Sequence, residues 1–151
     1  MSHSLTKVLI HAVWSTKYRH HLIDYEVESR VYGIISDEFA AAKCNLIIVN
    51  GMPDHVQCLF ELDSAYSLSA VIRQVKGGSS HVINQGDLIY DKFSWQVGYS
   101  AFSVSESMFW RVFNYIKNQK RHHQYNSFSD ELSGLLTVHG IDCKLHNAHV
   151  E

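Results

Sequence analysis

The order of apolar and polar positions predicts strands and helices that alternate along most of the chain. Residues 5–16 are rich in β-branched and aromatic side chains, which is typical of a strand. In residues 26–43 the apolar positions return every three or four residues, as on one face of an amphipathic helix. The same criteria predict strands at 44–50, 55–62 and 93–102 and helices at 67–84 and 128–139. Between the last strand and the last helix, the third helix in chain order opens at an S-x-x-E capping box, 103–106, and runs to about residue 123.

This order of elements contains a split β-α-β pair. We therefore predict an α+β ferredoxin-like sandwich, an antiparallel sheet with helices on one face and the other face left open for a partner. The 151 residues are enough for one domain with its own core, which we assign to residues 5–140. Residues 141–151 are expected to form a C-terminal tail.

Composition narrows the class of protein further. With 46% hydrophobic residues and 1 Pro, the chain is not of the disordered type, and no apolar run reaches the ~20 residues of a membrane helix. Cys44, Cys58 and Cys143 are odd in number and form no C-x-x-C, which argues against a disulfide framework and a structural zinc site. We therefore expect reduced thiols in a cytoplasmic protein without a membrane segment.

One candidate site lies on the strand that alternates most regularly. Val56, Cys58 and Phe60 occupy one face, so His55 and Gln57 must point together from the other. Two ligand-type side chains on a face that the core does not use suggest a functional site. An ordinary solvent-facing polar pair fits the same spacing.

A second candidate is the tyrosine on the third predicted helix. Tyr115, Gln119 and His122 follow one another at steps of four and three residues, so they share one edge of the apolar stripe. A tyrosine in this position also serves as an amphipathic filler with its hydroxyl in water.

The formal net charge is -2, so nucleic-acid binding would have to come from local patches. Cations interleaved with rings and hydroxyls suit a phosphate backbone with unstacked bases. Solvated charges at the ends of elements explain such clusters equally well. The candidates are Lys17, Tyr18, Arg19, Arg73, Lys76, Ser79, Ser80, Lys117, Lys120, Arg121 and His122.

Five short motifs resemble, in order and spacing, the single-tyrosine HUH transposases, which include TnpA-like enzymes of insertion sequences and their REP-associated relatives. The resemblance covers about residues 5–140. The motifs are VWSTKYR at 13–19, MPDHV at 52–56, KGGSS at 76–80, WQVGY at 95–99 with FSVS at 102–105, and YIKNQ at 115–119.

The resemblance implies a ferredoxin-like sheet extended by a second copy in a homodimer, and cleavage and rejoining of single-stranded DNA at hairpin-flanked ends. By position, Tyr115 would be the nucleophile that forms a 5′-phosphotyrosine, and His55, Gln57 and Gln119 would hold Mg²⁺ or Mn²⁺. Gln57 stands where the family has its second histidine, and an amide oxygen is an acceptable ligand for a hard cation. The alternative is a catalytically impaired or domesticated protein that binds DNA hairpins with the same fold.

Overall fold

The computed structural model describes residues 4–124 and 126–142, so Cys143 and most of the predicted tail lie outside the described residues. Its sheet has the strand order β2-β3-β1-β4, and every neighbouring pair is antiparallel, as the ferredoxin-like prediction requires. The strands are β1 (Leu9–Ser15), β2 (Asn45–Met52), β3 (His55–Glu61) and β4 (Ser100–Val104). The helices are α1 (Glu28–Ala41), α2 (Leu68–Gln85), α3 (Phe109–Lys117), α4 (Gln119–His122) and α5 (Phe128–Val138), with 3-10 turns η1 (Lys17–Arg19) and η2 (Glu106–Met108).

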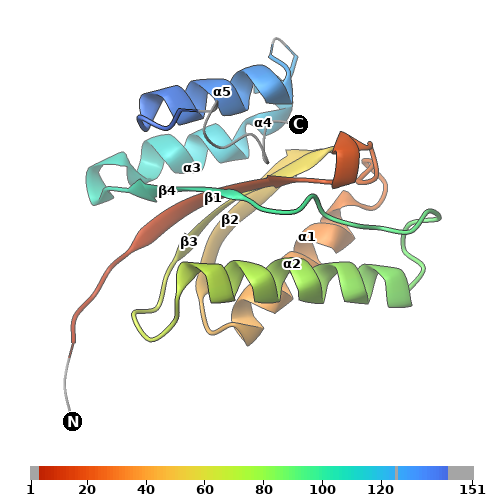
Figure 1. The fold of residues 1–151 in the computed structure, drawn as a ribbon, viewed down its shortest axis with the longest axis horizontal. Helices are drawn as coiled ribbons and strands as arrows, with labels where there is room; N and C mark the ends of the chain where they lie inside the picture. The colour runs from red at the N-terminus through yellow and green to blue at the C-terminus, as the bar shows by residue number, and fades with distance from the viewer. Residues whose placement is uncertain (1–3, 125, 143–151) are drawn as a thin grey trace.

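The first face of the sheet carries the larger apolar core, and α1 and α2 cover it (Figure 1). Alternate residues of β1 and β3 point into this core, among them Trp14, Val56 and Phe60. They pack on the apolar stripes of the two helices, which include Val31, Ile35, Phe39, Val71, Ile72 and Val75. The alternation predicted for the strands and the 3.6-residue repeat predicted for the helices therefore both supply residues to this core.

The second face is not open, in contrast to our prediction. All seven residues of β1 are buried, because α3, α4 and α5 cover this side of the sheet (Figure 1). A smaller apolar cluster joins Val13 and Phe102 of the sheet to Phe128, Leu132 and Leu136 of α5. The last helices close this face because their apolar stripes need a partner, and the sheet supplies one.

The strand predicted at residues 93–102 is shorter than expected and begins only at Ser100. Before that point the backbone has two hydrogen bonds to the chain at the end of β1, from Gln96 N to Ser15 O and from Lys17 N to Ser94 O at 2.9 Å each, and its other partners are side chains. Asn84 exchanges two hydrogen bonds with the backbone of Phe93, at 2.9 and 2.8 Å, and Lys76 Nζ donates to the carbonyl of Gln96 at 2.7 Å. In this described segment the ladder is reduced to one isolated bridge, between Thr16 and Trp95, so residues 93–99 form no continuous strand.

The predicted capping box of the third helix does not form. Ser103 lies in β4 opposite Ile10, so its backbone belongs to the sheet and cannot begin a helix. The chain turns into η2 instead, and the helical segment breaks at Asn118 (φ -98°, ψ 23°) into α3 and α4. Among the helices of the described residues, none is both long and apolar enough to span a bilayer.

Candidate active site

His55 and Gln57 project from β3 to the second face of the sheet, as the alternation predicts. Both side chains are fully buried beneath α3–α5, which excludes the solvent-facing interpretation. The His55 ring is fixed from behind, because Nδ1 lies 2.7 Å from Oδ1 of Asp54 and a carboxylate can only accept. Burial, the largest single influence, would raise the pKa of Asp54, but the hydrogen bond with His55 and the nearby charges of His55 and His21 together outweigh it, and the pKa is lowered. His55 therefore presents Nε2 to the interior of the site.

Gln119, at the start of α4, faces His55 Nε2 across the interior of the site. Its Oε1 is 3.3 Å from His55 Nε2, and it accepts a hydrogen bond from Gln57 Nε2 at 3.1 Å. The three residues expected to hold a cation are thus brought together from β3 and α4. Their proximity depends on the break at Asn118, which starts a new helical segment at Gln119.

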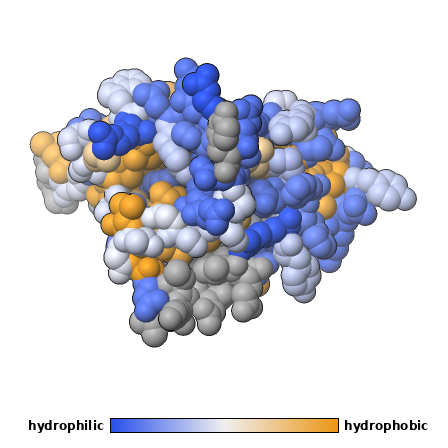
Figure 2. Space-filling model, turned by 90° about the horizontal axis from the view of Figure 1, so that it is seen from above, coloured by the Kyte–Doolittle hydropathy of each residue, from blue (hydrophilic) through white to orange (hydrophobic). Residues whose placement is uncertain are grey.

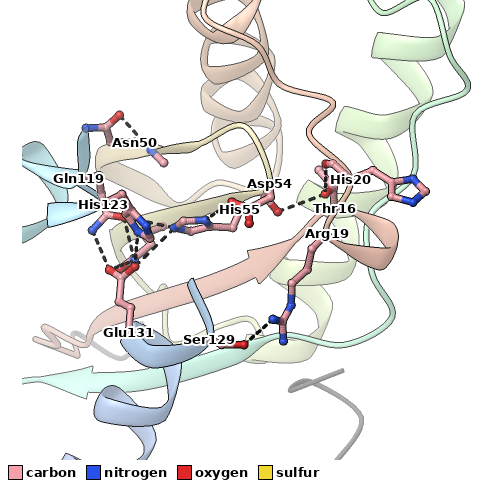
Figure 3. A network of polar contacts seen from close by, with 12 residues as sticks. Thr16, Arg19, His20, Asn50, Asp54, His55, Gln119, His123, Ser129 and Glu131 are labelled. Carbon is pink, nitrogen blue, oxygen red and sulfur yellow. Dashed lines mark hydrogen bonds and ion pairs between the residues drawn. The ribbon is translucent and has the colours of Figure 1, made fainter. Parts of the chain in front are cut away.

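Glu131, which sequence reasoning missed, occupies the centre of the site (Figure 3). Its Oε1 accepts hydrogen bonds from Gln57 Nε2 at 2.6 Å, from Gln119 Nε2 at 2.9 Å and from the hydroxyl of Tyr115. The predicted nucleophile is therefore tied to the predicted ligands through this one carboxylate. Glu131 lies in the first turn of α5, where acidic residues are common at helix N-termini, so nothing in the sequence marks it.

His123, which follows α4, is the second residue that sequence reasoning did not assign to the site. Its Nε2 forms an ion pair with Oε2 of Glu131, and His55 Nε2 lies 3.7 Å from the same oxygen. The side chains of His123 and Glu131 are only 7% and 6% exposed. The sequence showed His123 only as part of a basic segment.

The electrostatics follow from this crowding of polar groups. Burial would raise the pKa of Glu131, but the hydrogen bonds from His123, Tyr115 and Gln119 lower it to about 2. Burial, followed by the contact with Glu131, raises the pKa of Tyr115 well above its ordinary value. The site therefore combines an ionised carboxylate with a neutral phenol.

The donor set suits a divalent cation. Ligand atoms of His55, His123 and Glu131 all lie within 4.8 Å of one another. Apart from their contact with each other, the buried His123 Nε2 and Glu131 Oε2 have no hydrogen-bond partner within residues 4–124 and 126–142. Imidazole and carboxylate together are ordinary ligands of transition-metal ions.

Two cavities give access to Tyr115. One of about 340 Å³ lies against Tyr115 and Glu131, and one of about 420 Å³ lies between Tyr115, Phe102 and Arg111. The face seen in Figure 2 is mostly hydrophilic, with apolar side chains showing as separate patches toward both ends. An extended polar chain could thus reach the tyrosine from solvent.

The predicted DNA-contacting residues fall into two groups. His122 lies beside the site, with its ring 4.9 Å from that of Tyr115, and Arg19 reaches α5 by donating to Ser129 Oγ at 2.5 Å. Tyr18 is 68% exposed in η1, and Lys120 forms an ion pair with Glu28 at 3.0 Å. Lys17 in η1, Lys117 at the end of α3 and Arg121 in α4 are also exposed.

The second group lies on α2, across the sheet from the active-site cluster. Arg73 is exposed there, and Ser80 donates to the carbonyl of Gly77 at 3.1 Å. Ser79 is buried and accepts a hydrogen bond from Trp95 Nε1 at 2.9 Å. Burial lowers the pKa of Lys76 to about 8. The structure does not bring these residues to Tyr115, and contact between them and DNA stays a prediction.

The sequence model of the IS200-like transposases matches residues 4–119 of the chain. The chain belongs to this transposase family. The match ends at Gln119, so it includes His55, Gln57 and Tyr115 but not His123 or Glu131. The two residues that sequence reasoning missed therefore lie beyond the matched segment.

Individual relatives of this transposase agree with the family match. The ISDra2 transposase TnpA of Deinococcus radiodurans is 25% identical over 114 residues, which is 72% of this chain and 81% of that protein. A crystal structure of a predicted transposase of Deinococcus radiodurans R1 superposes with a TM-score of 0.59 at 24% identity, over 79% of this chain and 95% of that one. A REP-associated tyrosine transposase bound to a REP hairpin gives a TM-score of 0.61 at 14% identity, over 83% and 76%. The two structures show that the fold is shared.

Proposed function

We propose that this transposase cleaves and rejoins single-stranded DNA at hairpin-flanked ends through a 5′-phosphotyrosine on Tyr115. The observation that carries the proposal is the contact of the Tyr115 hydroxyl with Glu131, which is itself bonded to Gln57 and Gln119. A tyrosine that only filled the edge of a helix would have its hydroxyl in water. Here the hydroxyl points into a buried polar cluster beside an open cavity.

The chemistry uses the residues as follows. The Tyr115 oxygen attacks the scissile phosphorus, the bond to the 3′ oxygen breaks, and the strand leaves with a 3′-hydroxyl. The phenol proton passes to Glu131, which accepts its hydrogen bond, and the departing 3′ oxygen takes up one proton to become the hydroxyl. Because the new phosphotyrosine conserves the energy of the broken bond, a 3′-hydroxyl can later reverse the reaction without ATP. A Mg²⁺ or Mn²⁺ ion held beside His55, Gln57 and Gln119 would supply charge stabilisation at the scissile phosphate.

We further propose that the partner is a single-stranded DNA hairpin, since one structural neighbour is a transposase bound to a REP hairpin. The residues around η1 and α4 lie on the side of Tyr115 and suit the strand to be cut, whereas those of α2 suit a more distant part of the DNA. In this sheet β4 pairs only with β1 and β2 only with β3, so each has an edge to which a second copy could add. We place the homodimer in the cytoplasm, where Cys44 and Cys58, both free, would stay reduced.

An adduct assay tests the enzymatic proposal. Labelled hairpins from the DNA that flanks the gene are incubated with the protein in Mn²⁺ or Mg²⁺, and covalent complexes are separated under denaturing conditions. Wild type should form an adduct that EDTA prevents. Tyr115→Phe should bind the hairpin with unchanged affinity and form none. An adduct retained in Tyr115→Phe would refute the assignment of the nucleophile.

The same assay tests the second candidate function, a hairpin-binding protein without cleavage. The presence of Gln57 in place of a second histidine favours this reading. It predicts hairpin binding by wild type without an adduct in either cation.

A further inference from the structure

We propose that the cation is held by His55, His123 and Glu131, together with Gln119, and that Gln57 is a positioning residue instead of a ligand. This proposal specifies the ligands of the cation that the proposed function uses. It rests on the proposed function only for the role that the cation plays. Two of these ligands, His123 and Glu131, lie in the chain after Gln119. His123 takes the place of the second histidine of the family.

The hydrogen bonds of Gln57 show which end of its amide faces the cluster. Its Nε2 lies 2.6 Å from Glu131 Oε1 and 3.1 Å from Gln119 Oε1, and both of these oxygens are acceptors. Its Oε1 lies 2.7 Å from His11 Nε2, inside the protein. A glutamine binds a cation through its oxygen, so ligation would need a reversed amide whose oxygen abuts the carboxylate of Glu131. The arrangement favours Gln57 as a donor that orients Glu131.

The lone pairs that do converge belong to other residues. Because Asp54 takes the proton on Nδ1, His55 Nε2 carries a lone pair in the neutral ring, and this lone pair faces Gln119 Oε1 at 3.3 Å and Glu131 Oε2 at 3.7 Å. Acceptors that face one another in a buried space repel unless a proton or a cation lies between them. His123 Nε2 and Glu131 Oε2 contact each other at the border of the same space, and in the described chain neither atom has another hydrogen-bond partner.

His123 thus supplies the imidazole that position 57 lacks. Its ring centroid lies 4.8 Å from that of His55, and it reaches the site from the opposite side, from the end of α4 instead of from β3. Glu131 adds a negative charge. Two imidazoles with a carboxylate suit Mn²⁺ better than Mg²⁺, which prefers oxygen ligands and retains its waters.

Metal binding by the full-length protein without DNA tests this ligand set. Free Mn²⁺ is followed by its electron paramagnetic resonance signal during titration, and Mg²⁺ is then added as competitor. His123→Leu and Glu131→Gln should each weaken Mn²⁺ binding by at least about tenfold. Gln57→Leu, which carries the same replacement as His123→Leu, should weaken it by a smaller factor. His81→Leu, on the exposed side of α2, is the control and should bind as wild type does.

Folding is checked for each variant by its melting temperature without metal and by the rise in that temperature on adding Mn²⁺. A folded His123→Leu protein with wild-type Mn²⁺ affinity would overturn the proposal, as would loss of binding in Gln57→Leu alone. Preference for Mg²⁺ over Mn²⁺ would also contradict it. These outcomes are separate from failure of the proposed function, which is read from the DNA adduct and from Tyr115→Phe.

Discussion

The two faces of one strand, β3, serve opposite purposes. Toward α1 and α2, Val56, Cys58 and Phe60 are fully buried in an apolar core. Toward α3–α5, the equally buried His55 and Gln57 enter a cluster in which nearly every polar atom has a partner from another element. The first face gains free energy by removing apolar surface from water, whereas the second is stable only while its hydrogen bonds are complete.

This difference teaches where each kind of substitution should act. An apolar core tolerates loss of volume at a cost in stability that does not depend on chemistry elsewhere. A buried polar cluster makes the same residues responsible for stability and for function. Substitutions on the two faces should therefore separate the free energy of unfolding from metal binding and DNA cleavage.

The largest effect is expected on the apolar face. Phe60→Ala removes a fully buried ring whose centroid lies 4.8 Å from that of Phe39, so the free energy of unfolding should fall by about 3–5 kcal/mol. Urea unfolding measures this loss. At a temperature where the variant is still folded, Mn²⁺ affinity should match that of wild type. A metal-binding defect in the folded variant would contradict the separation of the two faces.

The second effect is a dependence of stability on pH that comes from Glu131. Its pKa is about 2 in the folded protein and near 4.5 in the unfolded chain. A lowered pKa contributes stability that is fully present above pH 4.5 and is lost as pH falls toward 2, here about 3 kcal/mol. In urea unfolding between pH 2 and 6, Glu131→Gln should flatten this part of the profile. Parallel profiles of the two proteins would show that the carboxylate is not held as described.

The apolar first face of the sheet, and the positions of His55 and Gln57 on the second face, could be predicted from the sequence, because both depend on local periodicity. The alternation of β3 placed His55 and Gln57 together, and the family motifs placed Tyr115 and Gln119 with them. Glu131 and His123 could not be found in this way. Glu131 reaches the site because α5 docks on the sheet through Phe128, Leu132 and Leu136, in part against Val13 near the other end of the chain. His123 reaches it because the helix breaks at Asn118 and the chain continues as α4.

The missed strand boundary has a similar cause. Residues 93–99 have the composition of a strand, but Asn84 and Lys76, both on α2, bind several of their backbone groups and leave only a short contact with the end of β1. Composition reports what a segment can do, while the partners of its backbone decide what it does. The second face is closed for a similar reason. The sequence shows that the last helices have apolar stripes, but it does not show that these stripes pack on the sheet.

The third prediction concerns the support behind the site. Asp54→Asn keeps the shape of the side chain but removes the charge that holds His55 Nδ1. We expect Mn²⁺ affinity to fall about tenfold, because such a carboxylate fixes the tautomer and direction of a ligating imidazole. The urea midpoint should change little in comparison with Phe60→Ala. Unchanged Mn²⁺ affinity in Asp54→Asn would argue that His55 is oriented by its other contacts, such as the ring of Phe128 stacked 4.3 Å away.

The smallest effect is expected at Ser67, which caps α2 on the apolar face. Its side chain accepts a hydrogen bond from the backbone of Ala70 at 3.1 Å, and Ser67→Ala should lower the free energy of unfolding by about 1 kcal/mol. Since α2 touches the sheet only on the side away from Tyr115, the adduct yield with a short single strand should be unchanged. A hairpin substrate makes the comparison sharper, because α2 also carries Arg73 and Lys76. If Ser67→Ala lowers the yield with the hairpin but not with the short strand, the first face takes part in DNA binding even though it takes none in the chemistry.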